Sequence, residues 1–228
     1  LIVKPALEDA SGGIDHDSVV HDQEKLEERV AHVWKEYEMP ALCEEYIEGR
    51  EIHAAVLGND PPEVLPFFEM EFDDSEFNPS KEWRPQIISY RAKWDPHSKD
   101  FYSMDTVCPA EKVSQDLGER IVEVARGAFR ALGGRDYARV DLRIDDDDNI
   151  YILEGNPNPD LVDGSAYVQC ATASGRTYTD MLGEIIEMAL DRIAAAKERA
   201  ASIAADPSKG GVAMDTLMRE YQLAKKDG

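Results

Sequence analysis

Asp136-Tyr137-Ala138-Arg139-Val140-Asp141-Leu142-Arg143 and Tyr151-Ile152-Leu153-Glu154-Gly155-Asn156-Pro157-Asn158-Pro159 are the two stretches that decide the fold of this chain. In both stretches apolar and polar side chains alternate, which is typical of β-strands. The polar turn between them predicts an antiparallel hairpin, with strands at 137–144 and 150–154 around 145–149. Because side chains alternate faces along a strand, one face of the hairpin is apolar and belongs in a core.

The other face of this hairpin is polar. It carries Arg139, Asp141, Ile152, Glu154 and, just past the second strand, Asn156. With the turn centred on 146–147, Arg139 lies across from Glu154, and Asp141 is its diagonal neighbour. Two carboxylates and an amide oxygen beside a guanidinium form an oxygen-rich site that suits Mg²⁺. The alternative interpretation is an ordinary solvated face with an Arg–Glu cross-strand pair.

Helices and short strands alternate along the rest of the chain. We expect strands at 1–3, 41–47, 51–57, 64–68 and 87–90, and helices at 22–38, 111–132, 165–173, 177–203 and 212–225. The turn Glu48-Gly49-Arg50 predicts that 41–47 pairs with 51–57. This pattern predicts an α+β fold with mostly antiparallel strands flanked by helices.

The composition argues against several classes of function. The 228 residues include 47 Asp and Glu against 25 Lys and Arg, a net charge of −22, which disfavours binding to nucleic acid or anionic membranes. Three separated cysteines without a Cys-x-x-Cys pair argue against a disulfide framework or a zinc knuckle, and favour a reducing cytoplasm. The histidines lack metalloprotease spacing, and Asp145–Asp148 lacks the Gly and Glu of an EF-hand loop.

Several motifs, in order, resemble those of the ATP-grasp superfamily, specifically the ATP-binding and catalytic portion of D-alanine–D-alanine ligases. The similarity runs from Leu1 to about Ala195. It implies two α+β subdomains that grip ATP: a small one over 1–58, a large catalytic one with the metal site over 59–205, and a linker and terminal helix over 206–228. Because the chain begins within an expected strand, we expect it to be the later part of a longer polypeptide. The resemblance implies an upstream substrate domain that this sequence does not include.

The resemblance assigns the nucleotide-binding residues one by one. Leu1-Ile2-Val3-Lys4-Pro5 is similar to a strand whose lysine, here Lys4, contacts the nucleotide. Ser11-Gly12-Gly13 is similar to a flexible loop whose backbone N–H groups approach phosphate. Leu42–Glu51 is similar to the segment that binds adenosine. The resemblance implies that Glu44 accepts a hydrogen bond from the adenine amino group and that the backbone of Tyr46 and Ile47 contacts the adenine edge. It also implies that Glu51 binds the ribose hydroxyls.

The catalytic residues follow from the same resemblance. Tyr90-Arg91-Ala92-Lys93-Trp94 is similar to a mobile loop whose lysine, here Lys93, contacts the terminal phosphates. Arg139, Asp141, Glu154 and Asn156 fall on the motif that binds the transferred phosphate and two Mg²⁺ ions, for which Mn²⁺ can substitute. Asp141 and Glu154 would be ligands of separate ions with Glu154 bridging, and Asn156 would complete the contacts.

The implied activity is an ATP-dependent carboxylate–amine ligase that forms an amide bond through an acyl phosphate. Its substrates would be amino acids or peptides, and the full-length form would be a homodimer. Two departures leave the substrates open. Trp94 and Ala10 replace a hydrogen-bonded Tyr–Ser pair, and Ala10 has no polar side-chain atom. Asp160-Leu161 replaces a substrate-binding stretch that begins with Gly, where Ser165 could substitute.

Three alternatives therefore stay open beside a D-alanine-type ligase. The first is an ATP-grasp ligase for another amino acid or peptide. The second is a nucleotide-binding fragment without catalytic activity, because part of the substrate pocket would be missing. The third is an acidic interaction domain that binds no nucleotide.

Overall fold

The structure is a computed structural model, and it describes residues 1–72 and 83–205. Residues Leu1–Met181 form one compact unit, and a second unit begins at Leu182. Within residues 1–72 and 83–205, the strands all lie in the first unit. The linker and terminal helix expected over 206–228 lie outside the described residues.

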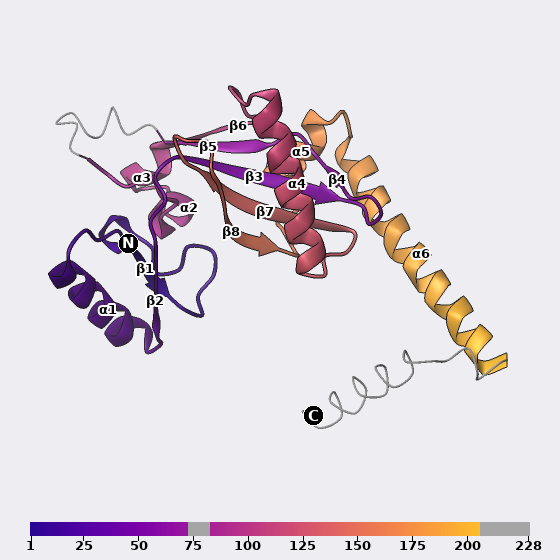
Figure 1. Cartoon of the computed structure of the whole chain (residues 1–228), viewed down its shortest axis with the longest axis horizontal. Helices are drawn as coiled ribbons and strands as arrows, with labels where there is room; N and C mark the ends of the chain where they lie inside the picture. The colour runs from indigo at the N-terminus through magenta and orange to yellow at the C-terminus, as the bar shows by residue number, and fades with distance from the viewer. Residues whose placement is uncertain (73–82, 206–228) are drawn as a thin grey trace. The chain divides into compact units, whose positions relative to one another are not determined.

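The described residues confirm the predicted mixture of helices and antiparallel strands (Figure 1). The strands are β1 (Ile2–Pro5), β2 (Ala41–Glu44), β3 (Arg50–Leu57), β4 (Glu63–Val64), β5 (Phe68–Phe72), β6 (Met104–Val107), β7 (Tyr137–Ile144) and β8 (Ile150–Asn156). The helices are the 3₁₀ segment η1 (His16–Ser18), α1 (Gln23–Tyr37), α2 (Tyr90–Trp94), α3 (Lys99–Tyr102), α4 (Gln115–Ala131), α5 (Ala166–Ala173) and α6 (Tyr178–Ala205).

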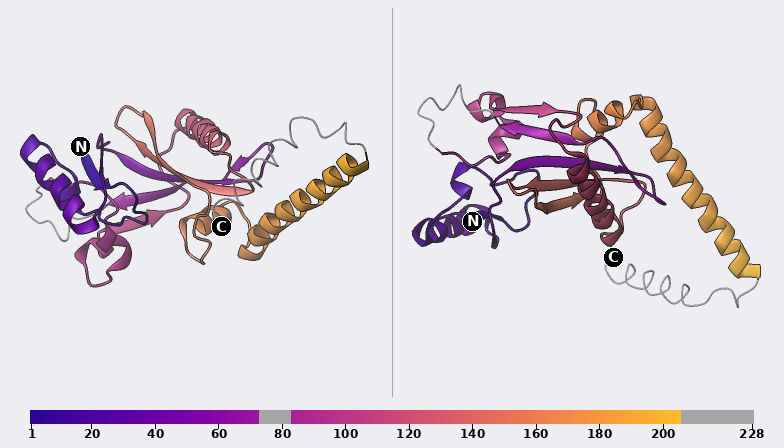
Figure 2. Two further views of the ribbon diagram at one scale, coloured as in Figure 1. Left: turned by 90° about the horizontal axis from the view of Figure 1, so that it is seen from below. Right: turned by 45° about the horizontal axis from the view of Figure 1, so that its top comes forward.

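The strands form two sheets. β1 and β2 make a two-stranded sheet, and the larger sheet has the order β6-β5-β3-β7-β8, with β4 also paired to β3. Every one of these pairings is antiparallel. Figures 1 and 2 show helix α4 lying across the larger sheet, and helix α1 beside the small sheet. The central position of β3 and β7 places their polar faces in the middle of the first unit.

Helix α4 covers the apolar face of the larger sheet. Its apolar residues recur at helical spacing, and Ser114 caps it by accepting a hydrogen bond from the N–H of Leu117 at 3.2 Å. Leu117 and Ile121 pack against Val140 and Leu142 of β7 in one buried cluster. Since this face of the hairpin is fixed in the core, the other face must be directed away from it.

Ile121 is fully buried in that cluster. We expect Ile121→Ala to lower the free energy of unfolding by about 2–5 kcal/mol, because it leaves a cavity between α4 and the sheet. Denaturant unfolding followed by circular dichroism measures this change, with Glu123→Gln on the exposed side of α4 as the control. A loss below about 1 kcal/mol would mean that α4 does not pack as described.

The predicted pairing of 41–47 with 51–57 is wrong. β2 ends at Glu44 and pairs with β1, whereas β3 pairs with β5 and β7. Gly49 does not close a hairpin: its φ is +136°, and a Cβ there would lie 2.0 Å from the carbonyl oxygen of Ile144. The chain therefore crosses from one sheet to the other at 45–49. As a result, the strands of the expected 1–58 subdomain are divided between the two sheets.

Two smaller differences concern the middle of the chain. The strand expected at 87–90 does not form; instead Ser89 caps the short helix α2 by accepting from the N–H of Ala92 at 3.1 Å. The second strand of the hairpin extends two residues beyond the prediction, to Asn156. Over 1–72 and 83–205, none of the helices has both the length and the apolar character needed to cross a membrane.

Candidate functional site

A cleft of about 940 Å³ lies in the first unit. Its walls come from the small sheet, the loop at 6–14, helix α2, and the polar faces of β3, β7 and β8. The residues expected from the sequence to bind the nucleotide and the metal all line it: Lys4, Ser11, Gly12, Glu44, Tyr46, Ile47, Glu51, Lys93, Arg139, Asp141, Glu154 and Asn156. The volume is that of a small-molecule site.

The β7–β8 hairpin forms the part of the cleft floor that the sequence predicts best. Asp141 lies directly across from Glu154, and Arg139 from Asn156. The expected register, with Arg139 across from Glu154, is therefore wrong by two residues here: the pairing beside the turn differs by one, with Ile144 across from Ile150, and a bulge adds one more. A bulge beside Asp141 and Leu142 adds Leu153 to β8 without a partner. The extra residue restores the alternation, so all four polar side chains still share one face.

Ile152 is the residue that the shifted pairing beside the turn moves. The sequence placed it on the polar face, but its cross-strand partner is Leu142, which belongs to the core. Tyr151 takes its place on the polar face, because it lies across from Arg143. The side chain of Ile152 still lines the cleft and is half exposed.

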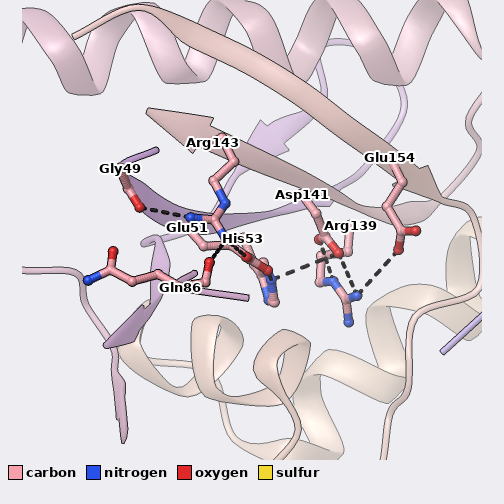
Figure 3. A network of polar contacts seen from close by, with 8 residues as sticks. All are labelled: Gly49, Glu51, His53, Gln86, Arg139, Asp141, Arg143 and Glu154. Atoms are coloured by element: carbon pink, nitrogen blue, oxygen red, sulfur yellow. Dashed lines mark hydrogen bonds and ion pairs between the residues drawn. The ribbon is translucent and has the colours of Figure 1, made fainter. Parts of the chain in front are cut away.

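Arg139 holds Asp141 with two short hydrogen bonds. Its Nε donates to Oδ1 at 2.6 Å and its Nη2 to Oδ2 at 2.8 Å, and the same Nη2 lies 3.8 Å from Oε1 of Glu154 (Figure 3). Asp141 is buried, which by itself raises the pKa of a carboxyl group, but His53 and Arg139 outweigh this and hold its pKa below the usual range. Partial desolvation, together with the nearby charge of Asp141, raises the pKa of Glu154.

These two carboxylates form a donor set that fits a hard divalent cation. They lie on opposite strands at one rung, and Asn156 adds an amide oxygen on the same face. Mg²⁺ takes few protein ligands and fills its shell with water and phosphate oxygens. No group of three or more His, Cys, Asp or Glu side chains is arranged for metal binding within the described ranges. The chain by itself therefore offers a partial coordination shell that a bound phosphate would complete.

The floor continues along β3 and β7 in residues that the sequence analysis did not assign. Arg143 is buried; its guanidinium lies 3.0 Å from Oε2 of Glu51 and donates to the carbonyl oxygens of Gly49 and Gln86 (Figure 3). His53 lies next along β3, with Nε2 3.3 Å from Oε1 of Glu51. Both residues follow from alternation, since Arg143 is two residues from Asp141 and His53 two from Glu51.

The end of the cleft near β2 combines apolar surface with polar groups. The apolar side chains of Leu42, Ile152 and Leu153 line it and are partly exposed. The hydroxyl of Tyr46 accepts a hydrogen bond from the N–H of Gln86 at 3.0 Å. Lys4 and Glu44 form an ion pair across the small sheet. A flat heterocycle with hydrogen-bonding edges fits this combination of surfaces.

The loop at 6–14 and helix α2 contact each other over the opposite wall. The indole N–H of Trp94 donates to the backbone oxygen of Ala10 at 3.2 Å, and the N–H of Tyr90 donates to the oxygen of Ile14 at 2.9 Å. Ala10 cannot make a side-chain bond, as expected from its sequence, but its backbone makes the link instead. These contacts place Lys93 over the cleft near Glu154, where desolvation and Asp141 raise the pKa of the carboxyl group and the charge of Lys93 offsets only part of that rise.

Comparison with known proteins identifies the family to which the chain belongs. The family model described as D-ala D-ala ligase C-terminus matches residues 1–187. The chain belongs to this family. Among curated members, it is 38% identical over 189 residues to the uncharacterized protein y4sG of Sinorhizobium fredii, covering 83% of this chain and 52% of that protein. It is 31% identical to the D-alanine–D-alanine ligase of Desulfotalea psychrophila, covering 84% and 54%.

Solved structures of D-ala D-ala ligases share the fold, which is the ATP-grasp fold. The D-alanine–D-alanine ligase of Bacillus anthracis complexed with ATP matches with a TM-score of 0.60 and 24% identity, covering 83% of this chain and 52% of that one. The ligase of Coxiella burnetii matches with a TM-score of 0.64 and 23% identity, covering 91% and 49%. This member of the ligase family therefore spans about half the length of the relatives it matches.

The segment after β8 is where this family member departs from the sequence expectation. Asn158 and Asp160 line the cleft, and the hydroxyl of Tyr137 donates to Oδ1 of Asn158 at 3.0 Å. Ser165, expected as a possible substitute in binding a substrate carboxylate, is not among the lining residues; its hydroxyl donates to the backbone oxygen of Asp160 at 2.7 Å. This end of the cleft is therefore acidic rather than rich in hydroxyl groups.

Proposed function

We propose that this chain is the ATP-binding, catalytic portion of an ATP- and Mg²⁺-dependent carboxylate–amine ligase. One observation carries the proposal: Arg139, Asp141, Glu154 and Asn156 share one face of the β7–β8 hairpin, inside a cleft large enough for a nucleotide. Membership of the D-ala D-ala ligase family supports the same conclusion. The two sheets would correspond to two subdomains, with the larger one beginning at β3 and the expected upstream substrate domain completing the enzyme.

In this proposal each part of the cleft has one task. Glu44 and the backbone at Tyr46 and Ile47 bind adenine, and Glu51 accepts from the ribose hydroxyls. Lys4, Ser11 and Gly12 bind the phosphates from the other side. The positive charges of Lys4, Lys93, Arg139 and the bound metal ions would stabilise negative charge as it moves between oxygens during phosphate transfer. This reaction needs little covalent chemistry from the protein.

The catalytic residues position the phosphate that is transferred. Arg139 would turn from Asp141 toward the phosphate oxygens, and Lys93 would close over them and exclude water. Asp141, Glu154 and Asn156 would hold two Mg²⁺ ions, or Mn²⁺ in their place, which would neutralise the phosphate charge. A substrate carboxylate would accept the phosphate, and an amine would then displace it to form an amide.

We propose that both substrates, the carboxylic acid and the amine, are small molecules, each an amino acid or a peptide. Asp160 and the linkage of Trp94 to Ala10 favour a ligase for an acceptor other than D-alanine. The three free cysteines fit a reducing cytoplasm, and the full-length protein would be a homodimer.

Thermal unfolding with and without Mg²⁺ and ATP tests the nucleotide site. At 100 times Kd, a bound nucleotide should add about 2.7 kcal/mol of stability. The same concentration of GTP or of free phosphate should add much less. An unfolding midpoint that does not change with Mg·ATP would leave an acidic interaction domain as the better account. Binding without phosphate release from any mixture of amino acids would favour a non-catalytic fragment.

The raised pKa of Glu154 predicts a pH dependence of metal binding. Its cation-binding form is the carboxylate, so Mg²⁺ affinity should fall as the pH drops through this raised pKa, above the pH at which an ordinary Glu protonates. Without metal, the folded state holds this proton more tightly than the unfolded state. The group therefore adds stability at low pH, and this contribution is lost as the pH rises through the folded-state pKa.

Titration calorimetry of Mg²⁺ with ADP at several pH values measures this effect. As the pH is lowered, the Mg²⁺ affinity of the wild-type protein should begin to fall while the pH is still above about 4.5, the ordinary pKa of Glu. The Glu154→Gln variant should lack that part of the fall. The same profile in both proteins would assign the titration to another group.

Lys93→Ala is expected to weaken ATP binding by about ten-fold and ADP binding by much less, because only the terminal phosphate of ATP reaches helix α2 in this arrangement. The ratio of the two dissociation constants, measured by calorimetry, reports on that contact. Lys99→Ala, on the neighbouring helix α3 and outside the cleft lining, is the matched control. Equal losses for ATP and ADP would place Lys93 elsewhere along the nucleotide.

A further inference from the structure

Two rungs of polar residues lie side by side between β3 and β7. Glu51 lies across from Arg143, and His53 lies across from Asp141. All four side chains are buried, with 4–6% of each residue exposed. Burying ionisable groups costs free energy unless each has a well-placed partner. The row therefore connects the carboxylate at one end of the cleft with the carboxylate at the other.

His53 is the residue between these two carboxylates. Its Nε2 lies 3.3 Å from Oε1 of Glu51 and 3.9 Å from Oδ2 of Asp141 (Figure 3). Ionised carboxylates only accept hydrogen bonds, so Nε2 must carry the proton that lies between them. Nδ1 is buried and has no hydrogen-bond partner among the described residues. A single N–H group thus faces two acceptors.

The imidazole ring is held in place by its neighbour on the other side. His53 also lies across from Phe68 of β5, and the two rings stack with centroids 5.4 Å apart and planes at 14°. This packing restrains the ring, but a small tilt within its own plane would move Nε2 from one carboxylate to the other. The geometry therefore allows the Nε2–H group to change its acceptor from Glu51 to Asp141 without a larger movement of the ring.

We propose that His53 is a positioning residue through which the sugar hydroxyls of the nucleotide and the divalent cation bind cooperatively. This inference rests on the proposed function, in which Glu51 accepts from the sugar and Asp141 binds the cation. Hydroxyls that donate to Glu51 replace the bond from Nε2 and release it toward Asp141. Both oxygens of Asp141 accept from Arg139 in the structure. A bond from His53 holds the carboxylate while one oxygen turns to the cation, as second-shell partners of metal ligands do.

Manganese binding tests this coupling without any turnover. The chain, in excess over nucleotide, is titrated with Mn²⁺ in the presence of ADP or of 2′,3′-dideoxy-ADP, and free Mn²⁺ is followed by electron paramagnetic resonance. Both nucleotides offer the same diphosphate to the metal. We expect removal of the hydroxyls to weaken Mn²⁺ binding by about five-fold or more in the wild-type protein. By linkage, Mn²⁺ should raise the affinity for ADP over that for the dideoxy analogue by the same factor.

Two variants separate positioning from packing. His53→Phe keeps a ring stacked on Phe68 but has no N–H, so Mn²⁺ affinity should become the same with both nucleotides. His53→Gln supplies an N–H near the same place and should restore part of the difference. A wild-type protein that binds Mn²⁺ equally with both nucleotides, or a His53→Phe variant that keeps the wild-type difference, overturns the inference. Failure of ADP itself to bind the wild-type chain would instead contradict the proposed function.

Discussion

Glu154→Gln should weaken binding of the Mg²⁺–nucleotide complex by at least about 100-fold and abolish phosphate transfer. Loss of an outer-shell partner of a metal site already costs about 10–100-fold in affinity, and we propose that Glu154 binds the cation directly. The substitution keeps the size of the side chain and removes one charge. Because 60% of the Glu154 side chain is exposed, the free energy of unfolding should change by less than about 0.5 kcal/mol.

Calorimetry with Mg·ADP measures the loss, and denaturant unfolding checks the fold. Glu123→Gln, an exposed carboxylate of helix α4 outside the cleft, makes the same chemical change and should leave binding unaltered. Wild-type affinity in Glu154→Gln would remove this residue from the metal site. A large loss of stability would instead mean that Glu154 has a structural role.

The second large effect is expected at Arg143. Arg143→Met keeps most of the length of the side chain but removes the cationic partner of Glu51, which retains only its contact with His53, and the donor to the carbonyl oxygens of Gly49 and Gln86. Breaking a buried ion pair from one side costs about 3–5 kcal/mol, since the remaining charge is buried and unpaired. Nucleotide affinity should fall as well, because Glu51 would no longer be held in place.

Arg120→Met is the matched control for this change. Arg120 is exposed on helix α4 and pairs with Asp116 one turn away, a contact expected to contribute well under 1 kcal/mol. Arg143→Lys keeps the charge but lacks the planar guanidinium, so its loss in the free energy of unfolding should lie between those of Arg143→Met and Arg120→Met. If Arg143→Met unfolds within about 0.5 kcal/mol of the wild type, the network along the cleft floor does not support the fold.

The hairpin could be predicted from the sequence because its signal is local. Alternation along 137–144 and 150–154 fixes which side chains share a face, and the structure places the polar ones together. The register was beyond this reasoning, because the pairing beside the turn is shifted by one residue, with Ile144 across from Ile150, and a bulge at Leu153 adds a second shift that restores the alternation. Two errors in the pairing thus left the predicted cluster intact.

Non-local contacts explain the other differences. Nothing in 41–57 indicates that β2 pairs with β1, some forty residues earlier, while β3 enters a sheet completed only by β7. The contact between Trp94 and Ala10 uses a backbone oxygen, which no side-chain pattern records. Arg143 and His53, by contrast, were available: each follows by alternation from an assigned carboxylate two residues away.

We propose that one face of the β7–β8 hairpin binds a divalent cation and a nucleotide, and anomalous diffraction from a crystal of the chain grown with Mn²⁺ and ADP tests this proposal. We expect a manganese peak about 2.1 Å from carboxylate oxygens of Asp141 and Glu154, with the diphosphate completing the shell. A nucleotide bound in the cleft with its metal away from both carboxylates, or bound outside the cleft, would contradict it.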